Sequence, residues 1–132
     1  MRSTIVSGAV AVLIGALQTI LLTYCWVYIP TYNPLPLWLV HSHITGVPNH
    51  VAVGAGDFVI NVLLCLPAAY AIRKLRPRNL SVYVPLAVAP IFLWAFWPVL
   101  GPWLWSDTPG AFSALLMLPV AVFLLRRVAA SA

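Results

Sequence analysis

Three histidines and one aspartate are the residues of this sequence that could bind a metal ion. His41 and His43 are two residues apart, His50 follows, and Asp57 begins the next apolar segment. Imidazole and carboxylate groups are ligands for zinc and copper. On extended backbone an HxH pair can point both rings the same way, but on a helix the rings diverge by about 200°. The sequence therefore predicts no cofactor, and histidines that bind water, headgroups or a partner. The alternative is a zinc or copper site on the outer face.

A second set of residues could form a polar pocket in the middle of the membrane. Three prolines each lie near the middle of an apolar segment, where each leaves the carbonyl four residues earlier without its usual partner. Gln18 lies at a similar depth and must find a hydrogen-bonding partner, because an unpaired buried amide costs about 1 to 3 kcal/mol. Interrupted helices form substrate sites in some carriers, although single prolines also occur in membrane helices without a site. The predicted pocket residues are Gln18, Asp57, Asn61, Pro67, Pro90 and Pro119.

Groupings that would support enzyme catalysis are scarce. The chain has two carboxylates and contains no GxSxG, no HExxH and no glycine-rich phosphate loop. A proton-coupled exporter needs a carboxylate deep in the membrane, whereas Gln18, the residue at that depth here, does not titrate. We therefore do not expect an enzyme.

The composition places these residues in an integral membrane protein. The 132 residues are 63% hydrophobic and 7% charged, whereas a soluble domain has roughly 25% charged residues. A bilayer core requires about 20 apolar residues per helix, so the length allows four crossings. We expect a single all-α membrane domain, residues 1–132, built as a polytopic bundle of four transmembrane helices. The predicted spans cover about 4–29, 57–75, 80–100 and 109–127.

The first two spans are joined by a predicted outer loop, residues 30–56. Prolines and glycines are frequent in it, so no continuous helix is expected to run through it. Its apolar stretch around Trp38 is too short to cross a bilayer and suits the headgroup region. We predict a short interfacial helix at about 37–43.

Basic residues predict the orientation. All seven Lys and Arg lie at predicted span ends, namely Arg2, the loop 73–79, and Arg126 with Arg127. The positive-inside rule puts these ends in the cytoplasm, with both termini, and we expect a bacterial inner membrane. Anionic lipid headgroups are the expected partner of these groups. Nucleic acid is not an expected partner, because the basic residues lie at the ends of spans and do not form a patch on a soluble surface.

Small residues recur every four positions along the first span and predict a close-packing face. Its partner is either another helix of the same chain, which the short connections favour, or a second protein. Together with the aromatic side chain of the outer loop, this ridge is the predicted partner-packing face. Its residues are Ser7, Ala11, Gly15, Thr19 and Trp38.

Two functions of different classes fit these features. The first is a non-catalytic accessory subunit that binds another membrane protein, or a second copy of itself, through the partner-packing face. The second is a small oligomeric transporter or flippase whose path is lined by the polar pocket. The scarcity of polar chemistry in the sequence favours the first.

Overall fold

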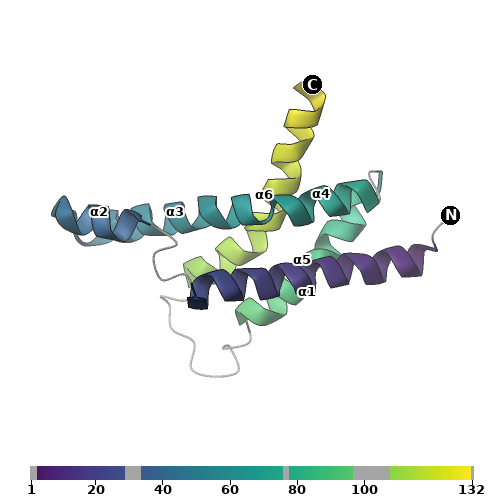
Figure 1. The fold of residues 1–132 in the computed structure, drawn as a ribbon, viewed down its shortest axis with the longest axis horizontal. Helices are drawn as coiled ribbons and strands as arrows, with labels where there is room; N and C mark the ends of the chain where they lie inside the picture. The colour runs from purple at the N-terminus through teal and green to yellow at the C-terminus, as the bar shows by residue number, and fades with distance from the viewer. Residues whose placement is uncertain (1–2, 29–33, 76–77, 97–107, 132) are drawn as a thin grey trace.

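The computed structural model of the protein describes residues 3–28, 34–75, 78–96 and 108–131. Within these ranges the ordered elements are helices, and no strand occurs in them. The all-α class predicted from the sequence is confirmed (Figure 1). The helices are α1 (Thr4–Tyr28), α2 (Leu35–His41), α3 (Val47–Leu64), α4 (Leu66–Leu75), α5 (Leu80–Phe96) and α6 (Thr108–Ser131).

Helix α1 is apolar on both its inner and its outer face. Inward-facing residues such as Ala11, Leu22 and Cys25 are buried. Large apolar side chains also cover the outer face, which in a soluble protein would carry polar groups. The hydroxyl groups of Thr19 and Thr23 donate to carbonyls one turn earlier in the same helix, at 2.9 and 2.8 Å. These two hydroxyl groups are thus satisfied without water.

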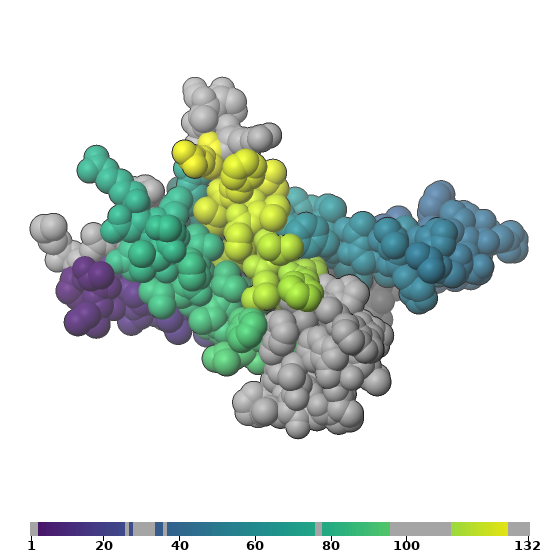
Figure 2. Space-filling model, turned by 180° about the vertical axis from the view of Figure 1, so that it is seen from behind, coloured from purple at the N-terminus to yellow at the C-terminus, as the bar shows by residue number. Residues whose placement is uncertain are grey.

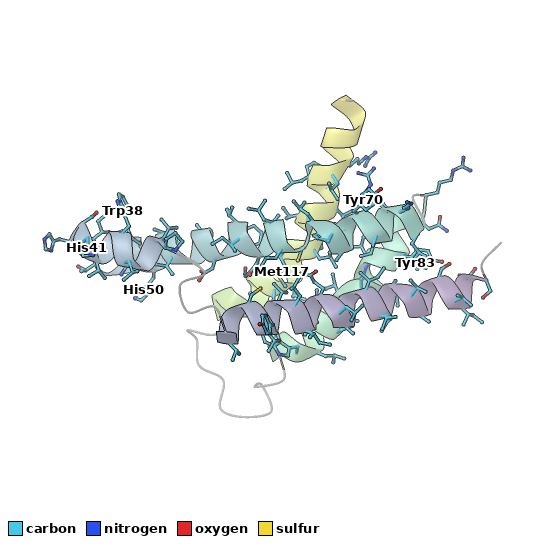
Figure 3. All side chains as sticks on the ribbon, in the orientation of Figure 1. Trp38, His41, His50, Tyr70, Tyr83 and Met117 are labelled. Atoms are coloured by element: carbon cyan, nitrogen blue, oxygen red, sulfur yellow. The ribbon has the colours of Figure 1, made fainter. Side chains whose placement is uncertain are left out.

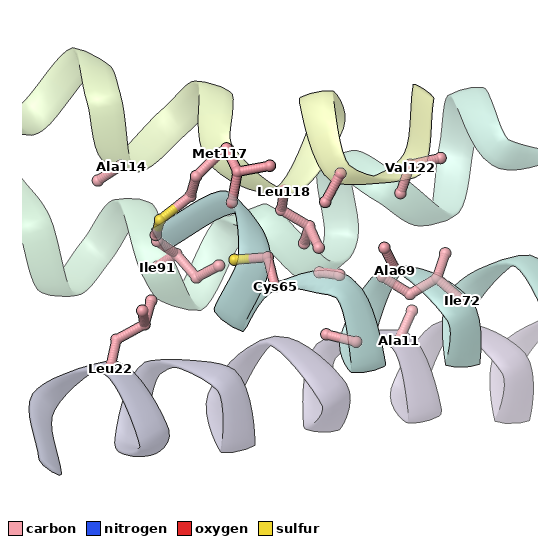
Figure 4. Packing of buried hydrophobic residues seen from close by; sticks show 14 of the residues in the cluster. Ala11, Leu22, Cys65, Ala69, Ile72, Ile91, Ala114, Met117, Leu118 and Val122 are labelled. Atoms are coloured by element: carbon pink, nitrogen blue, oxygen red, sulfur yellow. The ribbon is translucent and has the colours of Figure 1, made fainter. Parts of the chain in front are cut away.

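Four helices, α1, α4, α5 and α6, form what we call the bundle, and its core is apolar (Figure 4). Helix α5 contributes one residue per turn, Tyr83, Ala87 and Ile91. Helix α6 contributes residues at helical spacing, including Leu118 and Ala121, which are fully buried. This spacing of three and four puts each set on one helical face.

The small-residue ridge of α1 is buried within the chain, and Gly15 packs against α5. Ser7 and Ala11 are fully buried, and a Cβ added at Gly15 would overlap the backbone carbonyl of Ala87. Of the two alternatives that the sequence left open, the structure has the intramolecular one. Ser7, Ala11 and Gly15 are therefore covered by the chain itself.

Helix α3 begins at Val47, before the predicted start of the second span at about residue 57. Its N-cap, Gly46, has φ 76°, a conformation that glycine adopts without steric cost. Pro48 follows in the first turn, where its fixed φ and missing N–H suit a helix start. The prediction of a non-helical loop is therefore wrong for 47–56, whereas the short helix predicted at about 37–43 exists as α2.

The second predicted span is divided at Cys65, which separates α3 from α4. Pro67 lies in the first turn of α4 and has no N–H to offer the carbonyl of Leu63. That carbonyl accepts a hydrogen bond from a backbone N–H at the end of α3 instead. Helical bonding resumes where the N–H of Ala69 donates to the Cys65 carbonyl at 2.9 Å.

Prolines also lie inside the last two helices without ending them. Pro85 and Pro90 are within α5, and Pro119 is near the middle of α6. Helix α6 bends along its length, and its C-terminal part leads away from the other helices (Figure 1). A proline in a helix interior is an ordinary cause of such a bend. The end of the third predicted span, 97–100, lies outside the described residues.

Two helices of the described chain are long and apolar enough to cross a membrane, Thr4–Cys25 of α1 and Val47–Leu64. Only 28% and 11% of their residues are buried inside the protein, whereas the core helix of a soluble protein is mostly buried. The apolar stretches of α5 and α6, Leu80–Ala95 and Phe112–Arg126, are shorter. The protein is thus helical, with two helices that could cross a membrane.

Replacement of Gly15 should disrupt the contact between α1 and α5. We expect Gly15→Ala to lower the free energy of unfolding by about 1 to 3 kcal/mol, because the new methyl group must displace the backbone of Ala87. Thermal unfolding of the detergent-solubilised protein, followed by circular dichroism, measures this change. The matched control is Gly8→Ala on the same helix, whose Cβ would meet Leu86 Cδ1 at an ordinary 3.7 Å. Equal stability of the two variants would contradict the close contact.

Candidate functional site

Gln18 has a hydrogen-bonding partner at the break between α3 and α4. Its side chain is 4% exposed, and its Nε2 donates to the carbonyl oxygen of Leu64 at 3.1 Å. The need for a partner was predicted from the sequence. Pro67 was predicted to free the carbonyl of Leu63. The hydrogen bond from Gln18 goes instead to the carbonyl of the next residue, Leu64, which is the last residue of α3. Gln18 and the proline break therefore meet at one place in the fold.

Apolar side chains occupy the space between the other proline-bearing segments. Pro90 precedes Ile91 and Pro119 follows Leu118, and both of these neighbours are fully buried. Together with Cys65 they pack in the core shown in Figure 4. Pro90 and Pro119 of the predicted pocket therefore border a packed apolar core.

Asp57 and Asn61 lie on α3, on the stripe that continues to Cys65. Asn61 is 8% exposed and Cys65 is fully buried, while Asp57 is half-buried. Asp57 and Asn61 each have an interaction partner. Their spacing of four puts these residues on one helical stripe, and polar residues on one face of an apolar helix predict that this face lies against protein. The burial of Asn61 and Cys65 agrees with this prediction. Asn61 precedes the Leu64 carbonyl by about one turn, so the polar groups of α1 and α3 lie at similar levels.

The histidines lie where α2 ends and α3 begins. His41 is the last residue of α2, His43 has φ 55° in the turn that follows, and His50 is on the first turn of α3. All three side chains are exposed, and His41 and His50 point in different directions (Figure 3). Among the described residues, no group of three or more His, Cys, Asp and Glu side chains is close enough to hold a metal ion. The structure does not bring the three histidines and Asp57 together.

Residues 35–56, comprising α2 and the first half of α3, form a projection that we call the arm. It extends away from the bundle in Figure 1 and, from behind, in Figure 2. Helix α2 packs back against α3, with Leu39 buried at 2% exposure. Other large apolar side chains of the arm are 60 to 74% exposed. They are Leu37, Trp38, Val40, Val47 and Val51.

The arm contains no Asp, Glu, Lys or Arg. The side-chain oxygen of Asn49 is buried in it and has no hydrogen-bonding partner. The sequence pattern indicates a role for Trp38 but does not predict the arm, because the prolines and glycines in 30–56 favour an interrupted chain. The order Gly46, Val47, Pro48 was the available signal, since glycine outside and proline just inside a helix mark its start.

Basic residues gather at the end of α4 that is remote from the arm (Figure 1). Arg73 and Lys74 are in the last turn of α4, where cations are favoured by the helix dipole. The Lys74 ammonium group lies 6.0 Å from the centre of the Tyr70 ring. Arg78 is exposed shortly after the helix. This end is thus the cationic end of the described chain.

These features define a class of protein rather than a chemical reaction. The chain is helical, has two helices that could cross a membrane, and carries an uncharged arm at one end and basic residues at the other. Comparisons with protein-family models, with curated proteins and with solved structures find no significant match.

Loss of the Gln18 amide should destabilise the protein. We expect Gln18→Met, which keeps the length of the side chain, to cost about 0.6 to 2 kcal/mol because the Leu64 carbonyl loses this donor. Thermal unfolding in the same detergent measures the loss. Thr19→Val is the matched control, since its hydroxyl group bonds only to its own helix at Gly15 and should matter little. An unchanged Gln18→Met would mean that the bond does not contribute to stability.

Proposed function

We propose that the protein crosses the membrane four times, with both termini in the cytoplasm of a bacterial cell. The crossings are α1, α3 with α4, α5, and α6. Helix α1 has 25 residues, about 38 Å at 1.5 Å per residue, and a hydrocarbon core is about 30 Å thick. The basic residues at the end of α4 support a cytoplasmic position for that end. There they would meet anionic headgroups.

The hydrogen bond between Gln18 and Leu64 aligns α1 with α3, and this alignment indicates how deep in the membrane the arm lies. Helix α1 continues from Gln18 to Tyr28, about 15 Å, while α3 reaches back from Leu64 to Val47, about 26 Å. Because the two helices run in opposite directions (Figure 1), the arm extends about 10 Å beyond the end of α1. The arm would then lie in the outer headgroup region, where Trp38 is a favoured residue type.

Within this topology, the function that the geometry supports best is that of a non-catalytic accessory subunit whose arm binds another membrane protein. One observation carries the proposal: the arm stands clear of the bundle with exposed apolar side chains and no charge. Exposed apolar patches of this kind are typical of interaction sites. Ser7, Ala11 and Gly15 of the predicted partner-packing face are buried within the chain, whereas Trp38 is exposed and Thr19 is half-buried, so the proposal rests on Trp38 and its neighbours in the arm.

A small oligomeric transporter or flippase is the second proposal. It is supported by the interruption of a helix at Cys65, where Gln18 of α1 bonds to the C-terminal end of α3. Interrupted helices with freed backbone groups form the substrate sites of several carriers. The apolar filling of the bundle core argues for the first proposal over this one.

The topology can be tested with a membrane-impermeant thiol reagent on intact cells. We expect a cysteine at His43 to react from outside and a cysteine at Arg78 to react only after the cells are broken. Both positions are exposed, and the unmodified protein is the blank because Cys25 and Cys65 are buried. Reaction of Arg78→Cys from outside would contradict the orientation.

Docking through the arm can be tested by extraction from native membranes in a mild detergent. We expect one stoichiometric partner to co-purify, and Leu37→Ala with Trp38→Ala to reduce its recovery at least tenfold, since buried aromatic anchors carry much of an interface's energy. The matched control is Leu17→Ala with Ile20→Ala, which removes similarly exposed apolar side chains from α1. Recovery as free protein would count against docking. In that case, a flux into vesicles that Asn61→Leu abolishes would favour the transporter.

A further inference from the structure

We propose that the junction of α3 and α4 is a hinge that carries the arm, and that Gln18 acts as a latch on it. The hinge comprises Cys65, Leu66 and Pro67. The latch is the hydrogen bond from the Gln18 amide to the Leu64 carbonyl, which ties α1 to the last residue of α3. This hinge does not depend on which molecule binds the arm.

The junction has fewer backbone hydrogen bonds than a continuous helix would have. Cys65 is not part of either helix, and Pro67 cannot donate a hydrogen bond back to α3. The backbone bond from Ala69 to Cys65, at 2.9 Å, belongs to α4 and does not reach α3. Proline and a locally altered hydrogen-bonding pattern are the usual sites of sharp helix bending. The N–H of Cys65 still donates to the carbonyls of Asn61 and Val62, at 3.0 and 3.1 Å. Bending is therefore easiest just after it, where Pro67 has no N–H to donate.

The two sides of the junction are held very differently. On α4, Ala68, Ala69 and Ile72 are buried in the bundle core, so α4 is fixed. On α3, Asn61 and Val62 close to the junction are buried and the helix contacts α6, whereas Val47 and Val51 in the arm are exposed. Because α4 is buried more completely than α3, motion at Cys65 would move α3 and the arm relative to α6 while α4 stays in place.

Gln18 is well positioned to restrain that motion. It lies one turn after Gly15, where α1 is in close contact with the backbone of α5, so the amide comes from a fixed helix. Its bond at 3.1 Å ends on the moving side of the hinge. Side-chain hydrogen bonds between membrane helices shift such equilibria by about threefold to tenfold. A partner that binds the arm could contribute a free energy of similar size, and so strengthen or release the latch.

A small rotation at the hinge gives a large displacement at the arm. Val47 lies about 26 Å from Leu64 along α3, so a rotation of about 10° moves it by about 4 Å. A pair of spin labels, one at Val47 and one at Ile20 of α1, would report this motion. Both positions are exposed, and the native cysteines are buried.

The experiment measures the distance distribution between these labels in the full-length protein in lipid nanodiscs. We expect a narrow distribution for the latched protein and a second distance in Gln18→Met, with a population increased threefold to tenfold. Thr19→Val is the matched control and should leave the distribution unchanged. Gln18→Asn, whose amide is shorter and does not reach Leu64, provides the same test if Gln18→Met does not fold.

A double variant separates the hinge from the latch. Pro67→Ala restores a backbone donor at the junction and allows a continuous helix, so Gln18→Met with Pro67→Ala should regain the narrow distribution. A distribution that Gln18→Met and Gln18→Asn leave unchanged would overturn the latch. A second distance that persists in the double variant would overturn the hinge.

Discussion

Backbone N–H and C=O groups in apolar surroundings must find their partners within the chain, and most of this structure follows from that constraint. It accounts for a fold made of helices in the described residues and for threonine hydroxyls that bond to their own helix. It also makes each proline costly. At Pro67 the cost is met by ending one helix and starting another, with Gln18 bonding to the carbonyl at the end of the first.

Close packing of small residues holds the helices together around that bond. In a bilayer, apolar side chains gain little by leaving lipid for protein, so association depends on close backbone approach. Gly15 and Ala87 provide it between α1 and α5. Because Gly15 is one turn before Gln18, the closest helix contact and the interhelical hydrogen bond support each other. This combination makes α1 a fixed reference for the rest of the bundle.

Periodicity and composition were sufficient to predict several of these features. The uncharged run of α1 predicted its helix, the four-residue spacing predicted the buried stripe of Asn61 and Cys65, and the depth of Gln18 predicted its need for a partner. The start of α3 was missed because Pro48 favours a helix start but breaks a helix interior, and its position decides which.

Other features depend on tertiary geometry that spacing does not contain. Whether the small residues faced α5 or a second protein depended on which helix crosses α1. Gln18 bonds to the carbonyl of Leu64 and not to that of Leu63, which already accepts a backbone N–H at the end of α3. The histidines stayed apart because α2 ends at His41 and the chain turns before His50. In each case the local sequence set the alternatives and the packing chose between them.

The division between a packed bundle and an uncharged arm has an energetic consequence. Transfer of apolar surface out of water contributes roughly 25 cal/mol per Å², so a few of the exposed side chains of the arm could contribute several kcal/mol on binding. The restraint from Gln18 is worth about 0.6 to 1.4 kcal/mol, which corresponds to threefold to tenfold in population. Helix α3 is also held by its contacts with α6. In the proposed hinge, a partner bound to the arm would act against both restraints and change the angle of α3, while the contacts among α1, α4, α5 and α6 remain unchanged.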